Sequence, residues 1–309
     1  MQDVELAISY LQAGEVIALP TETVYGLAAA SSNEAAIEKI YDLKQRPSFN
    51  PLISHYASID EIAKDVELDS RAEKLLKHFS PGPLTLILNK KSNSRISAKA
   101  SANLKTAAVR IPNNPKTLEI LEKFAAPVAA PSANISGKLS PTSKNHVEAY
   151  FKDSLPLIID GGNSQIGLES TILDLSSDKA VLLRYGYITS QAIEAVLEET
   201  VFFKDESGEI KAPGMLLKHY APKCKLRAND GKAQDNEALI SFGKTQLSTG
   251  FQETINLSES GDLAQAAQNL FASIFRLEQK DYQSIAIDPI PNEGIGLAIN
   301  DRLSRAMAS

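Results

Sequence analysis

The sequence has little cysteine and no long apolar run, and each scarcity excludes a class of protein. Cys224 is the single cysteine among 309 residues, so neither an intramolecular disulfide framework nor a cysteine-rich zinc site can form. No uninterrupted apolar stretch approaches the roughly 20 residues that span a bilayer. Asp3 and Glu5 follow Met1 where a signal peptide would have its basic region. We therefore expect a cytoplasmic protein without a membrane segment.

The sequence also lacks an excess of positive charge. Its 32 Lys and Arg residues face 38 Asp and Glu residues, for a net charge of −6. Such a chain can bind tRNA through a local patch, but its bulk charge does not favour a dedicated nucleic-acid binder. A hydrophobic share of 43% in 309 residues is ordinary for a globular protein and leaves room for two domains.

The first two-thirds of the chain alternates short apolar runs with amphipathic stretches, which is typical of an α/β domain. The connections between several apolar runs are too short for crossover helices, so we expect a twisted mixed sheet. The pattern predicts strands at residues 16–19, 84–88, 107–111, 128–130, 157–159 and 172–175, and helices at 35–43, 72–79, 116–124 and 191–197.

A change of pattern near residue 201 divides the chain. We predict a first domain at 1–200, a linker or lid at 201–222, and a small Rossmann-like α/β domain at 223–309. The last region predicts strands at 238–242, 254–257 and 284–287, and helices from 263 to about 279 and at 297–307. It has no G-x-G-x-x-G loop, so dinucleotide binding is not supported.

Polar residues follow the first predicted strand in the segment 19–27, LPTETVYGL. Strand ends that open into polar loops bind ligands in open α/β sheets, and Thr21 is a candidate there. The same residues also suit a capped turn, because Thr and Glu commonly bond to nearby backbone groups. From these residues alone the two interpretations carry equal weight.

Two cations stand where a predicted helix gives way to a loop. Pro47 disfavours helical geometry at Arg46, so the helix should end near Lys44 and Arg46. Such a pair can clamp a triphosphate. Cations at a helix C-terminus also stabilise the helix dipole without any ligand, and for this segment alone that interpretation is favoured.

Arg110 lies inside an otherwise apolar predicted strand. A charge there is costly unless it is paired, so Arg110 meets either an internal carboxylate or an anionic ligand, and we favour the ligand. His55 ends another apolar stretch; a lone histidine more often has a core or surface role.

Donor-rich loops and a patterned linker complete the candidate segments. Ser132, Asn134 and Ser140 lie in loops of the kind that hold phosphates, although this spacing is a weak signal. Tyr220 belongs to the linker, which either folds over a site as a lid or docks on the domain surface.

Taken in order, these segments resemble the YrdC-type threonylcarbamoyl-AMP synthase family in its long two-domain form. The matching words are PTETVYGL (20–27), KQRP with NPL (44–52), PGPLT (81–85), AVRIP (108–112), APSAN (130–134), SPT (140–142), IDGG (159–162), ESTILD (169–174), LLRYG (182–186), APGMLLKHYAP (212–222) and GIGLAINDR (294–302).

The resemblance implies a twisted mixed-sheet YrdC-like core whose cavity holds ATP and L-threonine, with a Rossmann-like C-terminal domain. It implies that threonine is held by Thr21, His55, Arg110 and Ser170, with Arg110 on the threonine carboxylate. It implies that ATP is held by Lys44, Arg46, Asn50, Thr106, Ser132, Asn134, Ser140, Arg184 and Tyr220, with Lys44 and Arg46 as the catalytic cations.

The implied reaction joins L-threonine, bicarbonate or carbon dioxide, and ATP into threonylcarbamoyl-AMP for a tRNA modification. We expect Mg²⁺ held mainly by the ATP phosphates, no protein metal site, and transient downstream threonylcarbamoyl-transfer proteins, with at most weak tRNA contact. One alternative is a double-stranded RNA or tRNA binding or ribosome-maturation module without turnover. Another is a carbamoyl-transfer enzyme of hydrogenase maturation, whose cysteine-rich zinc motifs a single cysteine cannot supply.

Overall fold

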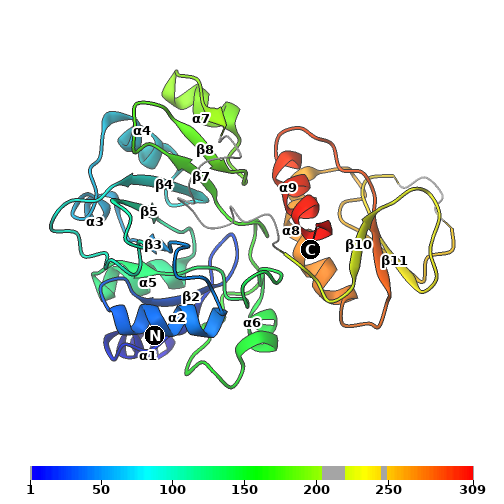
Figure 1. The fold of residues 1–309 in the computed structure, drawn as a ribbon, viewed down its shortest axis with the longest axis horizontal. Helices are drawn as coiled ribbons and strands as arrows, with labels where there is room; N and C mark the ends of the chain where they lie inside the picture. Colours follow the sequence, from blue (N-terminus) through cyan, green and yellow to red (C-terminus); the bar gives the residue numbers. More distant parts are fainter. Residues whose placement is uncertain (1, 204–219, 245–248, 309) are drawn as a thin grey trace.

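Two sheets organise the chain. The computed structural model describes residues 2–203, 220–244 and 249–308, which form the two lobes seen in Figure 1. The larger lobe contains a nine-stranded sheet of order β1-β2-β6-β3-β5-β4-β7-β8-β9, and the smaller lobe a four-stranded sheet of order β10-β13-β11-β12.

The larger sheet mixes parallel and antiparallel pairs, as predicted. β3 with β5, β4 with β7 and β8 with β9 are parallel, and the other neighbours are antiparallel. The strands are β1 (Ile17–Leu19), β2 (Gly26–Ala30), β3 (Ile53–His55), β4 (Leu84–Asn89), β5 (Thr106–Arg110), β6 (Val128–Ala129), β7 (Thr171–Asp174), β8 (Val181–Arg184) and β9 (Phe202–Phe203).

The predicted strand at residues 157–159 is wrong. This segment forms only an isolated bridge between Ile158 and Ala18. β9 lies in the range predicted as linker, where it pairs with β8 at the edge of the sheet. The remainder of that range, residues 204–219, lies outside the described residues.

Helices cover both faces of the larger sheet. They are α1 (Gln2–Gln12), α2 (Glu34–Lys44), α3 (Ile59–Ala63), α4 (Ser70–Phe79), α5 (Pro115–Phe124), α6 (Lys144–Phe151) and α7 (Ser190–Leu197). One core forms where α2, α4 and α7 pack on the sheet, and a second core forms under α1 and α5. The predicted end of α2 is confirmed, because the helix stops at Lys44 and Gln45 takes left-handed geometry at φ 50°.

Side-chain alternation leaves polar residues on one face of the central strands. Val109 of β5 joins the core under α2 and α4. Since successive strand residues point to opposite faces, Arg110 points the other way. His55 of β3 is directly opposite Arg110 in the parallel register, so both side chains share this face.

The smaller lobe is Rossmann-like. It contains β10 (Lys225–Ala228), β11 (Glu237–Ser241), β12 (Glu253–Asn256) and β13 (Ser284–Ile287), with α8 (Leu263–Leu277) and α9 (Gly296–Met307). All of its strand pairs are parallel. The long apolar face of α8 packs on this sheet together with α9, in a core that also takes in Leu139 and Leu168 of the larger lobe.

The two lobes meet in direct contact on the side of α8 and α9 (Figure 1). The His146 ring of α6 stacks on Phe275 of α8 with ring centroids 4.1 Å apart. A Cβ atom added to Gly167 would lie 2.6 Å from the backbone oxygen of Gln268. The backbones are therefore too close at this point for any residue larger than glycine.

Candidate active site

A polar cavity opens on the face of the central strands that carries His55 and Arg110. The space between its lining atoms, including the open mouth, is about 560 Å³. Its lining residues are Thr21, Thr23, Val24, Tyr25, Gly26, Arg46, Ile53, His55, Arg110, Ala130, Pro131, Ser132, Glu169, Ser170, Arg184 and Tyr220.

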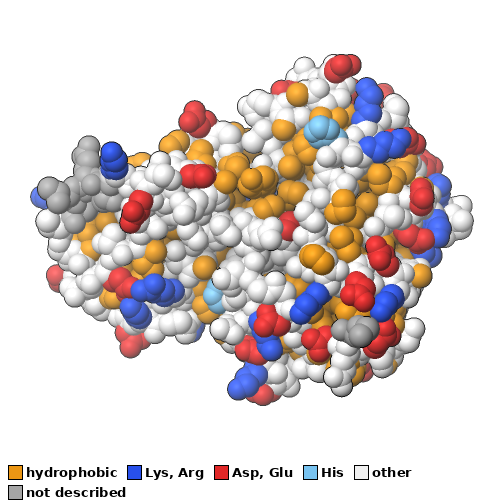
Figure 2. All heavy atoms as spheres, turned by 180° about the vertical axis from the view of Figure 1, so that it is seen from behind, with side chains coloured by type: hydrophobic (Ala, Val, Ile, Leu, Met, Phe, Trp, Pro, Cys, Tyr) orange, Lys and Arg blue, Asp and Glu red, His pale blue; other side chains and the backbone are white. Residues whose placement is uncertain are grey.

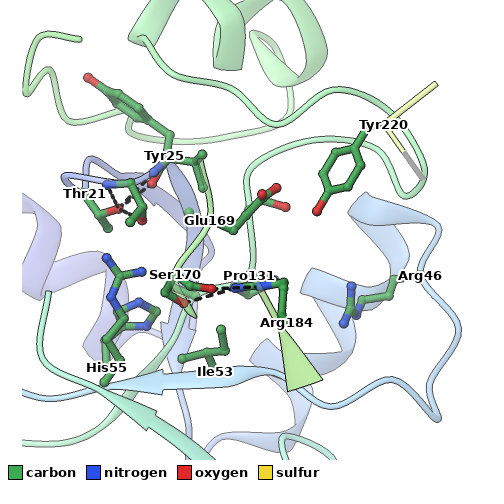
Figure 3. Close-up of a pocket in the computed structure, with 16 residues that line it drawn as sticks. Thr21, Tyr25, Arg46, Ile53, His55, Pro131, Glu169, Ser170, Arg184 and Tyr220 are labelled. Atoms are coloured by element: carbon green, nitrogen blue, oxygen red, sulfur yellow. Dashed lines mark hydrogen bonds between the residues drawn. The ribbon is translucent and has the colours of Figure 1, made fainter. Parts of the chain in front are cut away.

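The cavity has two ends (Figure 3). Thr21 and His55 lie at one end, Arg46 and Tyr220 lie at the other, and Glu169 lies between them. The structure thus brings together lining residues from eight separate sequence segments. Eight of the predicted site residues line the cavity: Thr21, Arg46, His55, Arg110, Ser132, Ser170, Arg184 and Tyr220.

Arg110 meets an internal carboxylate, which is one of its two predicted alternatives. Its Nη2 donates to Glu22 Oε1 at 2.7 Å, and its Nε donates to the backbone oxygen of Gly82 at 3.1 Å. Both side chains of the Arg110–Glu22 pair are only 4% exposed. Because Arg110 also lines the cavity, the pair presents a fixed cation to a ligand there.

His55 brings a neutral imidazole to the same end. Burial, with a further contribution from the charge of Arg110, lowers its pKa to about 3. Its buried Nδ1 has no hydrogen-bond partner among the described residues. A buried polar atom without a partner is costly, so His55 gains from a ligand that supplies one.

The Thr21 hydroxyl closes a local turn, as the capped-turn alternative predicted. It donates to the backbone oxygen of Val24 at 2.7 Å and accepts from the backbone N–H groups of Thr23 and Val24, each at 3.2 Å. The same turn forms part of the cavity wall. The capped turn is therefore confirmed, and ligand binding by Thr21 stays a prediction for a residue at the cavity wall.

Ser170 lines the cavity and is hydrogen-bonded to Thr85 and Arg184. Its Oγ lies 2.7 Å from Oγ1 of Thr85 and accepts from Arg184 Nη2 at 3.1 Å. Arg184 Nε also donates to the Ser170 backbone oxygen at 2.9 Å. Burial lowers the Arg184 pKa to about 10, which still leaves the guanidinium charged at neutral pH.

Arg46 is a buried cation at the other end of the cavity. It donates to the backbone oxygens of Asn50 at 3.2 Å and Pro51 at 3.1 Å. Within the described residues it forms no salt bridge, and burial lowers its pKa to about 10. The nearby Asn50 Oδ1 is also buried without a hydrogen-bond partner in that part of the chain. A buried cation without a carboxylate favours an anionic ligand.

Lys44 lies behind the cavity wall. Its Nζ donates to the backbone oxygens of Ser132 at 2.5 Å and Asn134 at 2.8 Å. Complete burial holds the Lys44 pKa well below its usual range. The ammonium group thus fixes the loop that carries Ser132 into the cavity.

Four other predicted nucleotide residues also lie outside the lining: Asn50, Thr106, Asn134 and Ser140. The Asn134 side chain donates to the backbone oxygens of Ile135 and Lys138, each at 2.8 Å. Ser140 Oγ donates to Glu169 Oε1. Thr106 begins β5, roughly 13 Å along the strand from Arg110 at about 3.3 Å per residue, and the structure does not bring it to the cavity.

Three residues of the site, Glu22, Tyr25 and Glu169, were not among the predicted site residues. Glu169 and Tyr25 line the cavity, and Glu22 holds Arg110. The Tyr25 hydroxyl donates to the Gly162 backbone oxygen at 2.7 Å and accepts from Gly161 N–H at 3.1 Å. All three lie inside motifs already recognised in the sequence, PTETVYGL and ESTILD, and this position was the one indication that they belong to the site.

Comparison with known proteins identifies the family. A family model described as telomere recombination matches residues 9–186, and the threonylcarbamoyl-AMP synthase C-terminal domain model matches residues 188–308. A threonylcarbamoyl-AMP synthase from Pyrococcus abyssi is 37% identical over 98% of this chain and 93% of its own length. One from Bacillus subtilis is 37% identical over 97% of this chain and 91% of its own length.

The chain belongs to the threonylcarbamoyl-AMP synthase family. The crystal structure of Pyrococcus abyssi Sua5 complexed with L-threonine matches with a TM-score of 0.89 and 35% identity, over 99% of this chain and 94% of that one. The function of the chain is accordingly the synthesis of threonylcarbamoyl-AMP, the adenylate intermediate of a tRNA modification.

A more distant likeness is one of fold alone. Full-length HypF in its phosphate- and nucleotide-bound form shares the first domain with a TM-score of 0.53 and 16% identity, and the match spans 28% of that chain. Across the described ranges, no helix has the length and apolar character to cross a membrane.

Proposed function

We propose that this chain uses L-threonine, bicarbonate or carbon dioxide, and ATP to form threonylcarbamoyl-AMP and pyrophosphate, in the cavity described above. The main support for placing these substrates in this cavity is the environment of Arg46. It is a buried guanidinium at a cavity wall with only backbone carbonyls as partners in the described ranges. ATP phosphates would supply the missing negative charge.

The end with Arg110 is the proposed threonine site. Arg110 would bind the threonine carboxylate, while Glu22 holds the guanidinium in place. The unpartnered Nδ1 of His55 would bond to the amino acid, and Ser170 would border it. Thr21 would shape the wall through its turn, since its hydroxyl is engaged within that turn.

The end with Arg46 is the proposed ATP site. Arg46, Arg184, Ser132 and Tyr220 would contact the nucleotide directly, because they line the cavity. Lys44, Asn134, Ser140 and Asn50 were predicted to contact ATP, with Lys44 as a catalytic cation; we propose instead that they hold the lining residues in place. Thr106 stays a predicted nucleotide residue without support from the cavity.

The proposed chemistry depends on alignment and charge. The threonine amine attacks carbon dioxide, formed from bicarbonate by loss of hydroxide where bicarbonate is supplied, and gives a carbamate with release of the amine proton. A carbamate oxygen then attacks the α-phosphorus, and the bond from the α-phosphorus to the leaving pyrophosphate oxygen breaks. Reactants held side by side gain from proximity, and fixed cations offset the charge that develops on the phosphates. Arg46 and Arg184 would provide that charge. The enclosing walls would keep water from the carbamate and the mixed anhydride.

Magnesium is proposed to bind mainly through ATP phosphate oxygens. The carboxylates nearest the cavity, Glu22 and Glu169, are each paired with an arginine. Neither therefore offers an unshared carboxylate to an ion. When bound, Mg²⁺ would neutralise phosphate charge.

The RNA-binding alternative is less favoured. On the face shown in Figure 2, Lys and Arg side chains alternate with Asp and Glu and do not gather in a basic stripe. We propose a cytoplasmic enzyme that passes its product to transient threonylcarbamoyl-transfer proteins, with at most weak tRNA contact. Salt-sensitive RNA binding without ATP turnover would favour the alternative.

A matched pair of arginine variants tests the ATP site. Arg46→Met removes the cavity guanidinium, and Arg71→Met removes one that also bonds two backbone carbonyls, those of Ser177 and Asp178, on the protein surface. We expect Arg46→Met to lower threonine-dependent pyrophosphate release at least tenfold and Arg71→Met to lower it less than twofold. Near-normal release by folded Arg46→Met would refute the assignment.

A further inference from the structure

The motif GIGLAINDR ends in an arginine of the C-terminal domain that is fully buried against the first domain. Arg302 lies on α9 and its side chain is 0% exposed. Its Nε donates to Glu169 Oε2 at 3.0 Å, and its Nη2 donates to the Tyr185 backbone oxygen at 2.8 Å. Its Nη1 bonds to the neighbouring Asp301 at 2.7 Å. One side chain of the smaller lobe therefore holds two segments of the larger one.

Two of the residues that Arg302 contacts line the cavity. Glu169 is one, and Figure 3 shows it between the two ends of the site. Tyr220 is the other: the Arg302 Cζ lies 5.6 Å from its ring centroid, and Phe271 of α8 stacks on the same ring at 5.4 Å. Glu169 and Tyr220 therefore both line the cavity, and side chains of the C-terminal domain hold them in place.

The negative charge of Glu169 gives the contact with Arg302 an electrostatic role. A carboxylate in a site for a triphosphate repels the ligand unless a cation offsets it, and in a buried setting this repulsion is poorly screened. Arg302 binds one carboxylate oxygen of Glu169, and Ser140 donates to the other. Packing between the domains is already provided by apolar side chains such as Phe275 and Phe271, so it does not by itself require a buried arginine.

We infer that Arg302 is a positioning residue for nucleotide binding. It offsets the charge of Glu169 and fixes Glu169 and Tyr220 at the cavity, so the C-terminal domain completes the site in the first domain. This inference rests on the proposed ATP site.

Calorimetric titration of ATP into the full-length protein tests the charge argument without turnover. We expect Arg302→Met to raise the ATP Kd at least tenfold, because Glu169 loses the cation bonded to its Oε2. Adding Glu169→Gln to Arg302→Met should return the Kd to within about threefold of wild type. The control Arg305→Met lies one turn along α9 and bonds to the same Asp301; it should change the Kd less than twofold.

Kinetics separate positioning from a general structural role. Arg302→Met should raise the ATP KM while the threonine KM changes less than twofold, and Arg302→Lys, which keeps the charge, should recover most of the loss. A folded Arg302→Met with an unchanged ATP Kd would overturn the inference. So would an equal rise in both KM values that Glu169→Gln does not relieve.

Two further outcomes are decisive. If Arg302→Met does not fold, Glu169→Gln alone carries the test: removing the negative charge should leave the ATP Kd unchanged or lower it, and a tenfold rise would overturn the inference. If wild-type protein binds ATP but releases no pyrophosphate with threonine and bicarbonate, the proposed function fails, while the Kd comparison still decides the role of Arg302.

Discussion

The buried Arg110–Glu22 pair allows stability and threonine binding to be separated. Arg110→Met leaves the Glu22 carboxylate buried, with the Asn113 backbone N–H at 2.9 Å still bonded to it. Removing one partner of a buried ion pair costs about 3–5 kcal/mol. At about 2–4 °C per kcal/mol for a domain of this size, the Tm should fall by roughly 6–20 °C.

Glu22→Gln combined with Arg110→Met removes both charges, so the double variant should recover most of that Tm in differential scanning calorimetry. It should not recover threonine binding, because the guanidinium proposed to hold the threonine carboxylate is still absent. A charged hydrogen bond contributes about 1.5–3 kcal/mol, so the threonine KM should rise roughly 10- to 150-fold in both variants.

Pyrophosphate release at varied threonine concentration, measured well below each Tm, gives the KM. A double variant with the wild-type threonine KM would refute the role given to Arg110. An unchanged Tm in Arg110→Met would refute the energetic reasoning.

Three further variants test other parts of the structure. Lys44→Met should raise the ATP KM at least tenfold with little change in the threonine KM, because the Ser132 loop loses its ammonium anchor; equal changes in both KM values would contradict this. Gly167→Ala should lower the Tm, because its Cβ would lie 2.6 Å from the Gln268 oxygen; a wild-type Tm would show that the backbones can separate freely. Burial lowers the His146 pKa to about 4 from 6.5, so the unfolded state binds more protons between these values and stability falls by up to about 1.4 kcal/mol per unit as pH drops from 6.5 to 4. His55, whose pKa is also lowered, contributes in the same range. His146→Phe should therefore reduce the slope of the urea-unfolding free energy against pH without abolishing it, and an unchanged slope would argue against a buried neutral His146.

Local patterns predicted the regular elements with clear signals. Asn33 accepts from two backbone N–H groups at the start of α2, and Pro47 follows its end, so both limits could be read from the sequence. α1 was missed although Val4, Ala7, Ile8 and Leu11 form a helical stripe. β2 was missed because its sequence, GLAAA, has low β propensity. Its strand conformation depends on pairing with β1 and β6, which the local sequence does not indicate.

The candidate site was predictable as a set of segments but not as a set of contacts. Arg110 in an apolar strand required a partner, yet only the fold brings Glu22 to it across 88 residues of chain. Likewise, nothing local pairs Arg302 with Glu169, which are 133 residues apart. Lys44 and Arg46 looked equivalent in sequence, but the geometry at the helix end directs one to a loop and the other to the cavity.

The central claim is tested most directly by supplying purified protein with ATP, magnesium and bicarbonate and adding each common amino acid in turn. We expect pyrophosphate release that requires both threonine and bicarbonate, with the mass of threonylcarbamoyl-AMP in the product. Folded protein that binds ATP but shows no release with any amino acid would contradict it.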